Sequence, residues 1–148
     1  MSRPPRIAVR ALILRDRRLL LVNAYPDGRS DLWCAPGGGV NAHQSLPESL
    51  VREVREETGL TVTVGAPALV NEFHDPELDL HQVDIYFRCL AEGRLPERWT
   101  DPAGIVTERR FFSRTELRDI RYKPDSLPLV AWDASSGISY DPLERLVR

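Results

Sequence analysis

Two short apolar runs near the N-terminus place the strongest constraint on how this chain folds. Residues 7–14 and 19–22 are almost entirely aliphatic, and a polar turn at residues 15–18 separates them. Short runs rich in aliphatic and β-branched residues are typical of strands. Because polar residues do not alternate with apolar ones, both faces of each strand must be covered. We therefore expect a hairpin inside a sheet that carries further layers on both faces.

Length and composition indicate a single domain over residues 1–148. The chain has 148 residues, of which 42% are hydrophobic and 28% charged, as in globular proteins. At this length about two-thirds of the unfolded surface can be buried, so a stable core can form without disulfide bonds. The two cysteines, Cys34 and Cys89, are too few for a disulfide framework.

Charge and hydropathy argue against two classes of partner. The formal net charge of −2 gives no basic field to hold a nucleic acid duplex by counterion release. No apolar run approaches the roughly 20 residues that a membrane helix needs. The first residues also lack the apolar segment of a secretory signal. We therefore expect a cytoplasmic protein with no membrane partner.

The remaining pattern predicts an α/β fold with one well-defined helix over residues 45–59. Ser45 and Glu48 fit a capping box, Pro47 fits a first turn, and Gly59 fits the left-handed residue after a helix. Strands are predicted over residues 61–64, 68–71, 83–90 and 109–112. A second helix is predicted from a capping box at residues 113–116, and a short last helix from residues 141–144. Residues 23–41, with Pro26 and Asp27, are predicted to form a loop, and residues 73–81 a mobile loop at the rim of a pocket.

Three glutamates of the predicted helix are spaced so that their side chains lie close together. Glu53, Glu56 and Glu57 follow an i, i+3, i+4 spacing, beside an apolar arc that faces the core. Like charges at this spacing destabilise a helix by a few tenths of a kcal/mol per pair. A solvated acidic face is one interpretation, and a divalent cation that removes the repulsion is the other. Carboxylate oxygens select a hard ion, Mg²⁺ or Mn²⁺, which commonly also binds substrate phosphates.

A run of three glycines lies shortly before this helix. Gly37, Gly38 and Gly39 carry no Cβ atom, so their backbone can approach a ligand closely. The glycines, the short connection and the acidic helix follow one another without interruption. Together they favour a metal site beside a phosphate-bearing substrate.

The same block resembles the Nudix box, G-x5-E-x7-R-E-U-x-E-E-x-G-U, where U is apolar. Gly38, Gln44 and residues 52–60 match its positions, with Gln44 in place of the first glutamate. Residues 33–38, Trp-Cys-Ala-Pro-Gly-Gly, also resemble the W-x-x-P-G-G lead-in of such proteins. The resemblance implies the fold of Nudix hydrolases, an α/β/α sandwich with a mixed β-sheet between helices.

The resemblance also implies a reaction, the metal-dependent hydrolysis of a pyrophosphate bond in a nucleoside diphosphate linked to another group X. Water attacks one phosphorus while Mg²⁺ or Mn²⁺ neutralises charge on the phosphoryl oxygens. By matching position, Glu53, Glu56 and Glu57 are the metal ligands, and the carbonyl of Gly37 adds one more. Arg52 is implied to pair with a box glutamate and orient it.

The general base stays open between the box and a downstream loop. Glu53 matches the box position that acts as base in some relatives, whereas Asp101 and Glu108 are the loop carboxylates of this chain. Ile105 stands where many relatives carry a loop glutamate. We therefore favour Glu53 and keep Glu108 as a catalytic candidate.

Substrate contacts are expected from loops and glycines. Arg29 can meet a phosphate, Gly38 and Gly39 admit a ligand, and Phe73 can stack on a base. The partner is a small nucleotide-like molecule: a nucleoside triphosphate, ADP-ribose, a nucleotide sugar or a dinucleoside polyphosphate. Similar proteins commonly pair through strands, so a homodimer is a further open point.

Gln44 supports an alternative function. A glutamine keeps the shape of a glutamate but carries no charge. We expect weakened metal binding from this change. The alternative is a degenerate Nudix module that binds a nucleotide without hydrolysing it.

Overall fold

A mixed β-sheet carries the fold in a computed structural model that describes residues 1–25, 28–133 and 137–148, so Pro26 and Asp27 of the predicted loop lie outside the described residues. The strands are β1 (Arg6–Arg15), β2 (Arg18–Asn23), β3 (Leu32–Trp33), β4 (Gly37–Gly39), β5 (Thr61–Asp75), β6 (Leu80–Glu92), β7 (Glu108–Ser113), β8 (Arg121–Tyr122), β9 (Ser139–Tyr140) and β10 (Glu144–Arg145). The main sheet runs β10-β5-β6-β1-β2-β7, with β4 paired to β1 and β9 paired to β5. A separate ladder joins β3 to β8.

The N-terminal hairpin forms as predicted. β1 and β2 pair antiparallel, and the turn between them places Asp16 and Arg17 at φ values of 51° and 63°. Positive φ at both turn residues is typical of the tight turn that matches strand twist. β1 also pairs parallel with β6 and antiparallel with β4, so the sheet is mixed.

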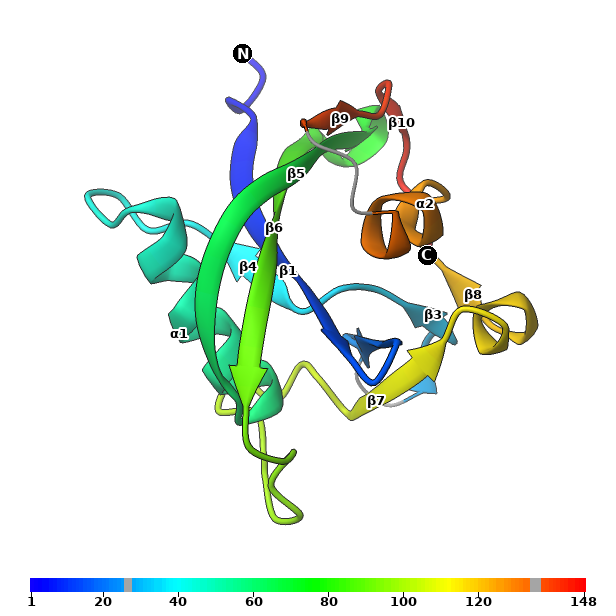
Figure 1. The fold of residues 1–148 in the computed structure, drawn as a ribbon. Coiled ribbons are helices and arrows are strands. Elements are labelled where there is room, and N and C mark those ends of the chain that lie inside the picture. The colour runs from blue at the N-terminus through cyan, green and yellow to red at the C-terminus, as the bar shows by residue number, and fades with distance from the viewer. Residues whose placement is uncertain (26–27, 134–136) are drawn as a thin grey trace.

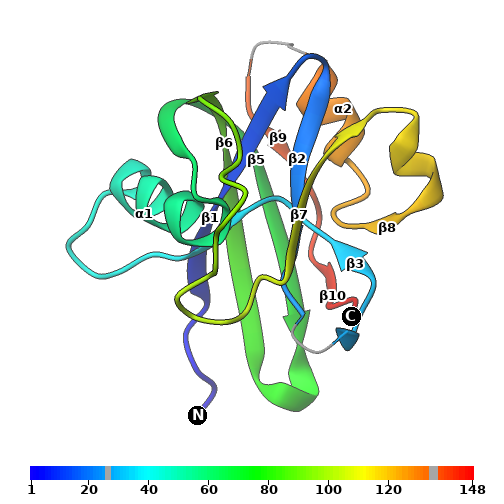
Figure 2. The same cartoon turned by 90° about the horizontal axis from the view of Figure 1, so that it is seen from below.

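Helices cover both faces of this sheet. α1 (Leu46–Thr58) lies on one side of the long strands, and α2 (Leu127–Trp132) lies on the other (Figures 1 and 2). Along β1, Ala11 and Ile13 pack in the same cluster as α1, whereas Leu12 packs in the same cluster as α2. The predicted double coverage and the α/β/α sandwich are therefore confirmed.

α1 begins and ends where the sequence predicts. The hydroxyl of Ser45 accepts a hydrogen bond from the backbone N–H of Glu48, with 3.1 Å between the two atoms. Gly59 ends the helix in the left-handed conformation, at φ 81°, and its N–H donates to the carbonyl of Arg55. Leu50 and Val54 are fully buried against the sheet, so the predicted apolar arc faces the core.

The strands after α1 are longer than predicted. β5 is a single strand over both predicted segments, with register shifts on either side of Pro67, which has no N–H to donate to the ladder. β5 and β6 also continue into residues 73–81, where only the short 3₁₀ helix η2 (Pro76–Leu78) and the turn after it separate them. The prediction of a mobile loop over residues 73–81 is therefore wrong.

Two predictions in the C-terminal part need correction. The capping box at Ser113 and Glu116 forms in both directions, but it opens only the 3₁₀ helix η3 (Glu116–Asp119). The predicted helix at residues 141–144 is wrong, because the N–H of Asp141 donates to Val70 and β10 pairs parallel with β5. The predicted strand at residues 109–112 is confirmed as β7. No helix of the described residues is long and apolar enough to cross a membrane.

β4 approaches β1 so closely at Gly37 that a side chain has no room. A Cβ atom at this position would lie 1.9 Å from the carbonyl oxygen of Val9. Gly37 pairs with Arg10 in the ladder, at a φ of 155°. The glycine is therefore required for β4 to dock on the sheet.

We predict that Gly37→Ala destabilises the protein by at least about 3 kcal/mol, because β4 must move away from β1. Urea unfolding measures the loss. The control is Gly93→Ala, at a residue with φ 79° but nothing within 4 Å of the added Cβ. That variant is expected to lose about 1 kcal/mol from backbone strain alone. Equal losses in the two variants would contradict the close approach.

Candidate active site

Glu57 is the carboxylate most deeply built into the fold. It lies on the face of α1 that contacts β4 and is only 9% exposed. The backbone N–H of Gly37 donates to its Oε2, with 3.0 Å between N and Oε2. β4, the strand of Gly37, Gly38 and Gly39 that we call the glycine strand, therefore fixes this carboxylate directly.

Glu53 lies one turn before Glu57 and also rests against the glycine strand. A Cβ atom on Gly38 would lie 2.6 Å from Cδ and Oε2 of Glu53, so the glycine leaves the space that this carboxylate occupies. Nη1 of Arg52 donates to Oε1 of Glu53 at 2.9 Å and lies 3.8 Å from Oε2 of Glu56. Arg52 thus bridges two of the three box carboxylates. Its Nε and Nη2 are buried without a partner among the described residues.

Negative charge accumulates at the inner end of this cluster. Burial is the largest cause that raises the pKa of Glu57, and the charges of Glu53 and Asp101 act in the same direction. The cation of Arg10 and the N–H of Gly37 lower it, and the net result is a pKa of about 7. A further positive charge in the site would therefore favour the ionised carboxylate.

The donor set suits a hard divalent cation. The described side chains do not already converge into a group of three or more His, Cys, Asp and Glu ligands. The three glutamates nevertheless lie on one helix next to β4, whose three residues are glycines. Glu53 fills the space left at Gly38. Oxygen ligands of this kind match Mg²⁺ or Mn²⁺. A bound cation would also relieve the charge that opposes ionisation of Glu57.

Arg10 belongs to the site and was missed by sequence reasoning. It lies on β1 with its side chain only 16% exposed, and Nε lies 3.3 Å from Oδ2 of Asp84. Nη1 donates to the carbonyl of Ala35, two residues before Gly37. Burial is the largest single cause and opposes the charge of Arg10, but Asp84, Cys34, Tyr86 and Glu57 together outweigh it and raise the pKa of the guanidinium. A charged residue inside the apolar run 7–14 was the available signal.

A family comparison agrees with this geometry. The family described as NUDIX domain matches residues 4–133. The chain belongs to the Nudix family. Nudix hydrolases generally use divalent metal ions.

The Nudix relatives include enzymes with different names. An ADP-ribose pyrophosphatase of Methanocaldococcus jannaschii is 32% identical over 85 residues, which cover 56% of this chain and 49% of the relative. Human diphosphoinositol polyphosphate phosphohydrolase 3-alpha is 32% identical over 100 residues, covering 66% of this chain and 56% of the relative. The chain thus spans about half the length of each. A Nudix hydrolase from Nitrosomonas europaea has the same fold, with a TM-score of 0.71, 24% identity and coverage of 86% and 84%.

The departure from the Nudix box at Gln44 is in contact with the start of α1. Oε1 of Gln44 accepts a hydrogen bond from the hydroxyl of Ser49, with 3.4 Å between the oxygens. Ser49 is buried in the first turns of α1. Gln44 therefore supports the start of the helix through Ser49.

The other predicted residues lie in three separate places. Glu108 lies exposed at the start of β7 and lines an outer hollow of about 780 Å³ with Trp33 and Trp99, which none of the box carboxylates lines. Arg29 is exposed in the loop after β2. Phe73 lines a different hollow, beneath the C-terminal segment. The structure therefore groups Glu53, Glu56, Glu57, Arg52 and the glycines, and leaves Glu108, Arg29 and Phe73 apart from them.

Asp101, the second loop carboxylate, holds the backbone of its own loop through hydrogen bonds. It is only 4% exposed and accepts hydrogen bonds from three backbone N–H groups. The donors are Ala103, Ile105 and Val106. These bonds occupy both carboxylate oxygens and fold the loop before β7.

We predict that Asp101→Asn lowers the free energy of unfolding by about 1–3 kcal/mol, because an amide replaces one accepting oxygen by a donor. Thermal and urea unfolding measure the change. The matched control is Asp125→Asn, at a side chain that is 82% exposed and contacts Lys123. Its cost is expected to stay below about 0.5 kcal/mol. A similar cost for both variants would contradict the role given to Asp101.

Proposed function

We propose that this chain is a divalent-metal-dependent pyrophosphohydrolase that cleaves a nucleoside diphosphate linked to another group. The observation that carries the proposal is the contact of two box carboxylates with the glycine strand: Glu57 with the N–H of Gly37, and Glu53 in the space at Gly38. Relatives named as pyrophosphatase and phosphohydrolase support the same class of reaction.

Glu53, Glu56, Glu57 and the carbonyl of Gly37 are the proposed ligands of Mg²⁺ or Mn²⁺. When bound, such an ion neutralises charge on phosphoryl oxygens and lowers the pKa of a coordinated water. The chain's contribution is to hold the ligands in place. Gly37 fixes Glu57 through its N–H, and Arg52 fixes Glu53 through Nη1.

Glu53 is also the proposed general base, which takes a proton from the attacking water. It is half-buried, and Arg52 holds one of its oxygens while the other rests against Gly38. Glu108 is the alternative base, and its place at the exposed start of β7 makes it second choice. Glu53 fills the space beside Gly38 and Arg6 the space beside Gly39, so only the backbone of these glycines is proposed to meet the diphosphate, with Arg29 as a further candidate phosphate contact.

A nucleotide-binding module without activity is the second candidate function. Only Gln44 favours it, because the first box glutamate is missing. Gln44 contacts Ser49 at the start of α1, whereas the three later glutamates are all retained. Metal-dependent turnover of any nucleotide in a broad panel would exclude this second function.

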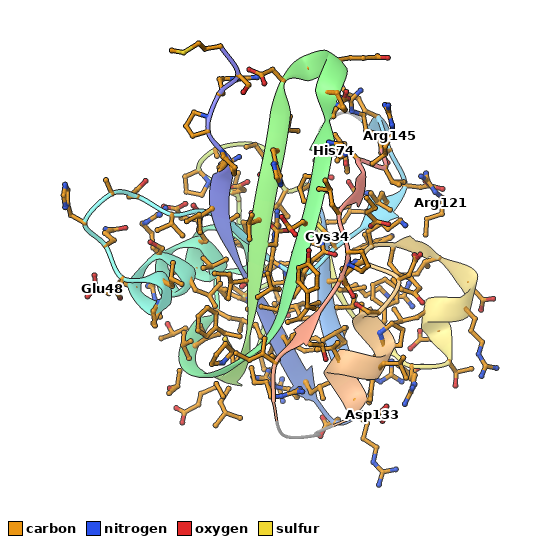
Figure 3. The ribbon with its side chains drawn as sticks, turned by 90° about the horizontal axis from the view of Figure 1, so that it is seen from above. Cys34, Glu48, His74, Arg121, Asp133 and Arg145 are labelled. Carbon is orange, nitrogen blue, oxygen red and sulfur yellow. The ribbon has the colours of Figure 1, made fainter. Side chains whose placement is uncertain are left out.

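We predict that Glu53→Gln lowers kcat by about 10²- to 10⁴-fold, because the base and one metal ligand are lost together. The measurement is product chromatography with ADP-ribose, nucleotide sugars and nucleoside triphosphates in Mg²⁺ or Mn²⁺. The control is Glu48→Gln, at an exposed residue in the first turn of the same helix. Figure 3 shows the side chain of Glu48 at the outer edge of the molecule, and its backbone N–H donates to the Ser45 cap, so its variant is expected to keep wild-type turnover. Comparable losses in both variants would contradict the assignment.

We predict that Mn²⁺ raises the Tm of the wild-type protein and that Glu57→Gln removes most of this shift. Binding to the folded state at 100 times Kd stabilises by about 2.7 kcal/mol. The amide oxygen of the variant can still accept from Gly37, so the fold is expected to survive. Thermal scans with metal and with EDTA measure the effect, and equal shifts in both proteins would contradict the ligand role of Glu57.

A further inference from the structure

Two side chains from outside the Nudix box fix the C-terminal end of α1. Nε1 of Trp99, in the segment between β6 and β7, donates to the backbone carbonyl of Glu56, with 3.0 Å between nitrogen and oxygen. Arg109, the second residue of β7, donates through Nη1 to the carbonyl of Thr58 and through Nη2 to the carbonyl of Pro96. The segment between β6 and β7 therefore passes this end of the helix, as Figure 1 shows.

These hydrogen bonds satisfy carbonyls that α1 does not satisfy itself. The last four carbonyls of an α-helix have no N–H partner inside the helix, and they carry the negative end of its dipole. The carbonyls of Glu56 and Thr58 are two of these four, because the N–H of Gly59 donates to Arg55. The cation of Arg109 also faces the negative end of the dipole. Both contacts therefore stabilise the last turn of α1 from outside the helix.

Trp99 and Arg109 also pack against each other. Cζ of Arg109 lies 4.6 Å from the centre of the Trp99 ring, which is a cation–π contact. Gly59 leaves room for this arrangement, since a Cβ atom there would lie 2.8 Å from Cγ of Pro96 and 3.1 Å from Cδ1 of Trp99. The Trp99–Arg109 pair is therefore one unit that joins β7 and the segment before it to the end of α1.

The hydrogen bond from Trp99 reaches the least constrained of the three box glutamates. The carboxylate of Glu56, a proposed metal ligand, is 39% exposed, and Nη1 of Arg52 lies 3.8 Å from its Oε2. Glu57, by contrast, is buried and bonded to the N–H of Gly37. Helix ends fray, so a contact with the backbone of Glu56 limits how far its side chain moves.

We propose that Trp99 and Arg109 are positioning residues, which hold the last turn of α1 so that Glu56 and Glu57 keep the places in which they bind a divalent cation. The inference rests on the proposed function and deepens it, because it extends the metal site to residues outside the box. Groups that orient metal ligands commonly change metal affinity by about 10- to 100-fold when they are removed. The Trp99–Arg109 pair acts through the backbone, so the lower end of this range is expected.

The test is Trp99→Phe, which keeps an aromatic ring beside Arg109 and removes the N–H that reaches Glu56. We expect a Kd for Mn²⁺ about 10-fold above the wild-type value, measured by electron paramagnetic resonance on the protein without nucleotide. The fold is expected to survive, with a Tm lower by about 2–4 °C from the lost hydrogen bond. An unchanged Kd would overturn the proposal.

Trp132→Phe is the matched control. Nε1 of Trp132 donates to the carbonyl of Arg17 at 2.9 Å, and Cζ of Arg114 lies 6.0 Å from the centre of its ring, so the same kinds of contact are present. Trp132 is the last residue of α2, on the face of the sheet opposite α1 (Figures 1 and 2). The variant is expected to lose a similar amount of Tm and to keep the wild-type Kd for Mn²⁺. An equal rise of the Kd in both variants would mean a general effect of lost stability and would contradict the positioning role.

Arg109→Lys tests the other half of the pair. Lysine keeps the positive charge, but one ammonium group does not replace the two guanidinium nitrogens that reach Thr58 and Pro96. The Kd for Mn²⁺ is expected to rise as in Trp99→Phe. Arg114→Lys, at the arginine that lies 3.7 Å from Asp133, is the control and is expected to keep the wild-type Kd. A wild-type Kd in Arg109→Lys would overturn the role of Arg109.

Metal binding and turnover together separate this proposal from the proposed function. If wild type binds Mn²⁺ but cleaves no nucleotide of the panel, the proposed function fails, and the Kd values still decide the role of the Trp99–Arg109 pair. If wild type cleaves a nucleotide and Trp99→Phe binds Mn²⁺ as tightly as wild type, the proposed function stands and the positioning role is wrong. No measurable binding of Mn²⁺ to wild type would overturn both.

Discussion

The close docking of β4 between β1 and α1 is the constraint on which the rest of the structure depends. At Gly37 the strand lies against the carbonyl of Val9 with no room for a Cβ atom, and the N–H of the same glycine holds Glu57. One residue later, Gly38 leaves the space that Glu53 fills. The lack of side chains at Gly37 and Gly38 therefore sets the positions of the sheet, the helix and the carboxylates relative to one another. A rigid support of this kind is what a metal site needs, because its ligands must be placed before the ion arrives.

The same docking concentrates charge that the fold only partly offsets. Burial and neighbouring carboxylates raise the pKa of Glu57, while Arg10 lowers it from the other side of β4. Arg52 performs a similar task at the surface, between Glu53 and Glu56. Because Arg10 is also paired with Asp84, the two arginines do not balance the carboxylates around them, and the site stays net negative. A divalent cation completes this balance, and its diphosphate partner then meets a site with little charge left to repel it.

Local patterns in the sequence predicted the parts whose partners lie nearby in the chain. The hairpin, the helix with its Ser45 cap and Gly59 stop, and the grouping of the glutamates depend on residues a few positions apart. One error involves a distant partner: residues 141–144 were predicted as a helix, but β10 pairs with β5 across about half the chain. Two errors are local, since residues 73–81 belong to the β5–β6 hairpin and the capping box at Ser113 opens only a 3₁₀ helix. Arg10 and Asp84, 74 positions apart, give no local sign of their ion pair. The surroundings of Phe73, which stays a predicted substrate contact, depend on where the C-terminal segment folds back and so have no local sign either.

This difference between local and distant contacts has a functional counterpart. The groups proposed for chemistry are contiguous in sequence, although their positions depend on the docking of β4 against β1. The groups around the hollow beneath the C-terminal segment come from β1, β5, β6 and that segment, and one of them, Arg10, also acts on Glu57. Asn71 also lies beside this hollow, and its Oδ1 is buried without a partner among the described residues, whereas Nδ2 and Oδ1 of Asn23 are both bonded. A buried acceptor without a partner costs stability, so the region that depends on distant contacts is less consistent with its local chemistry than the box is.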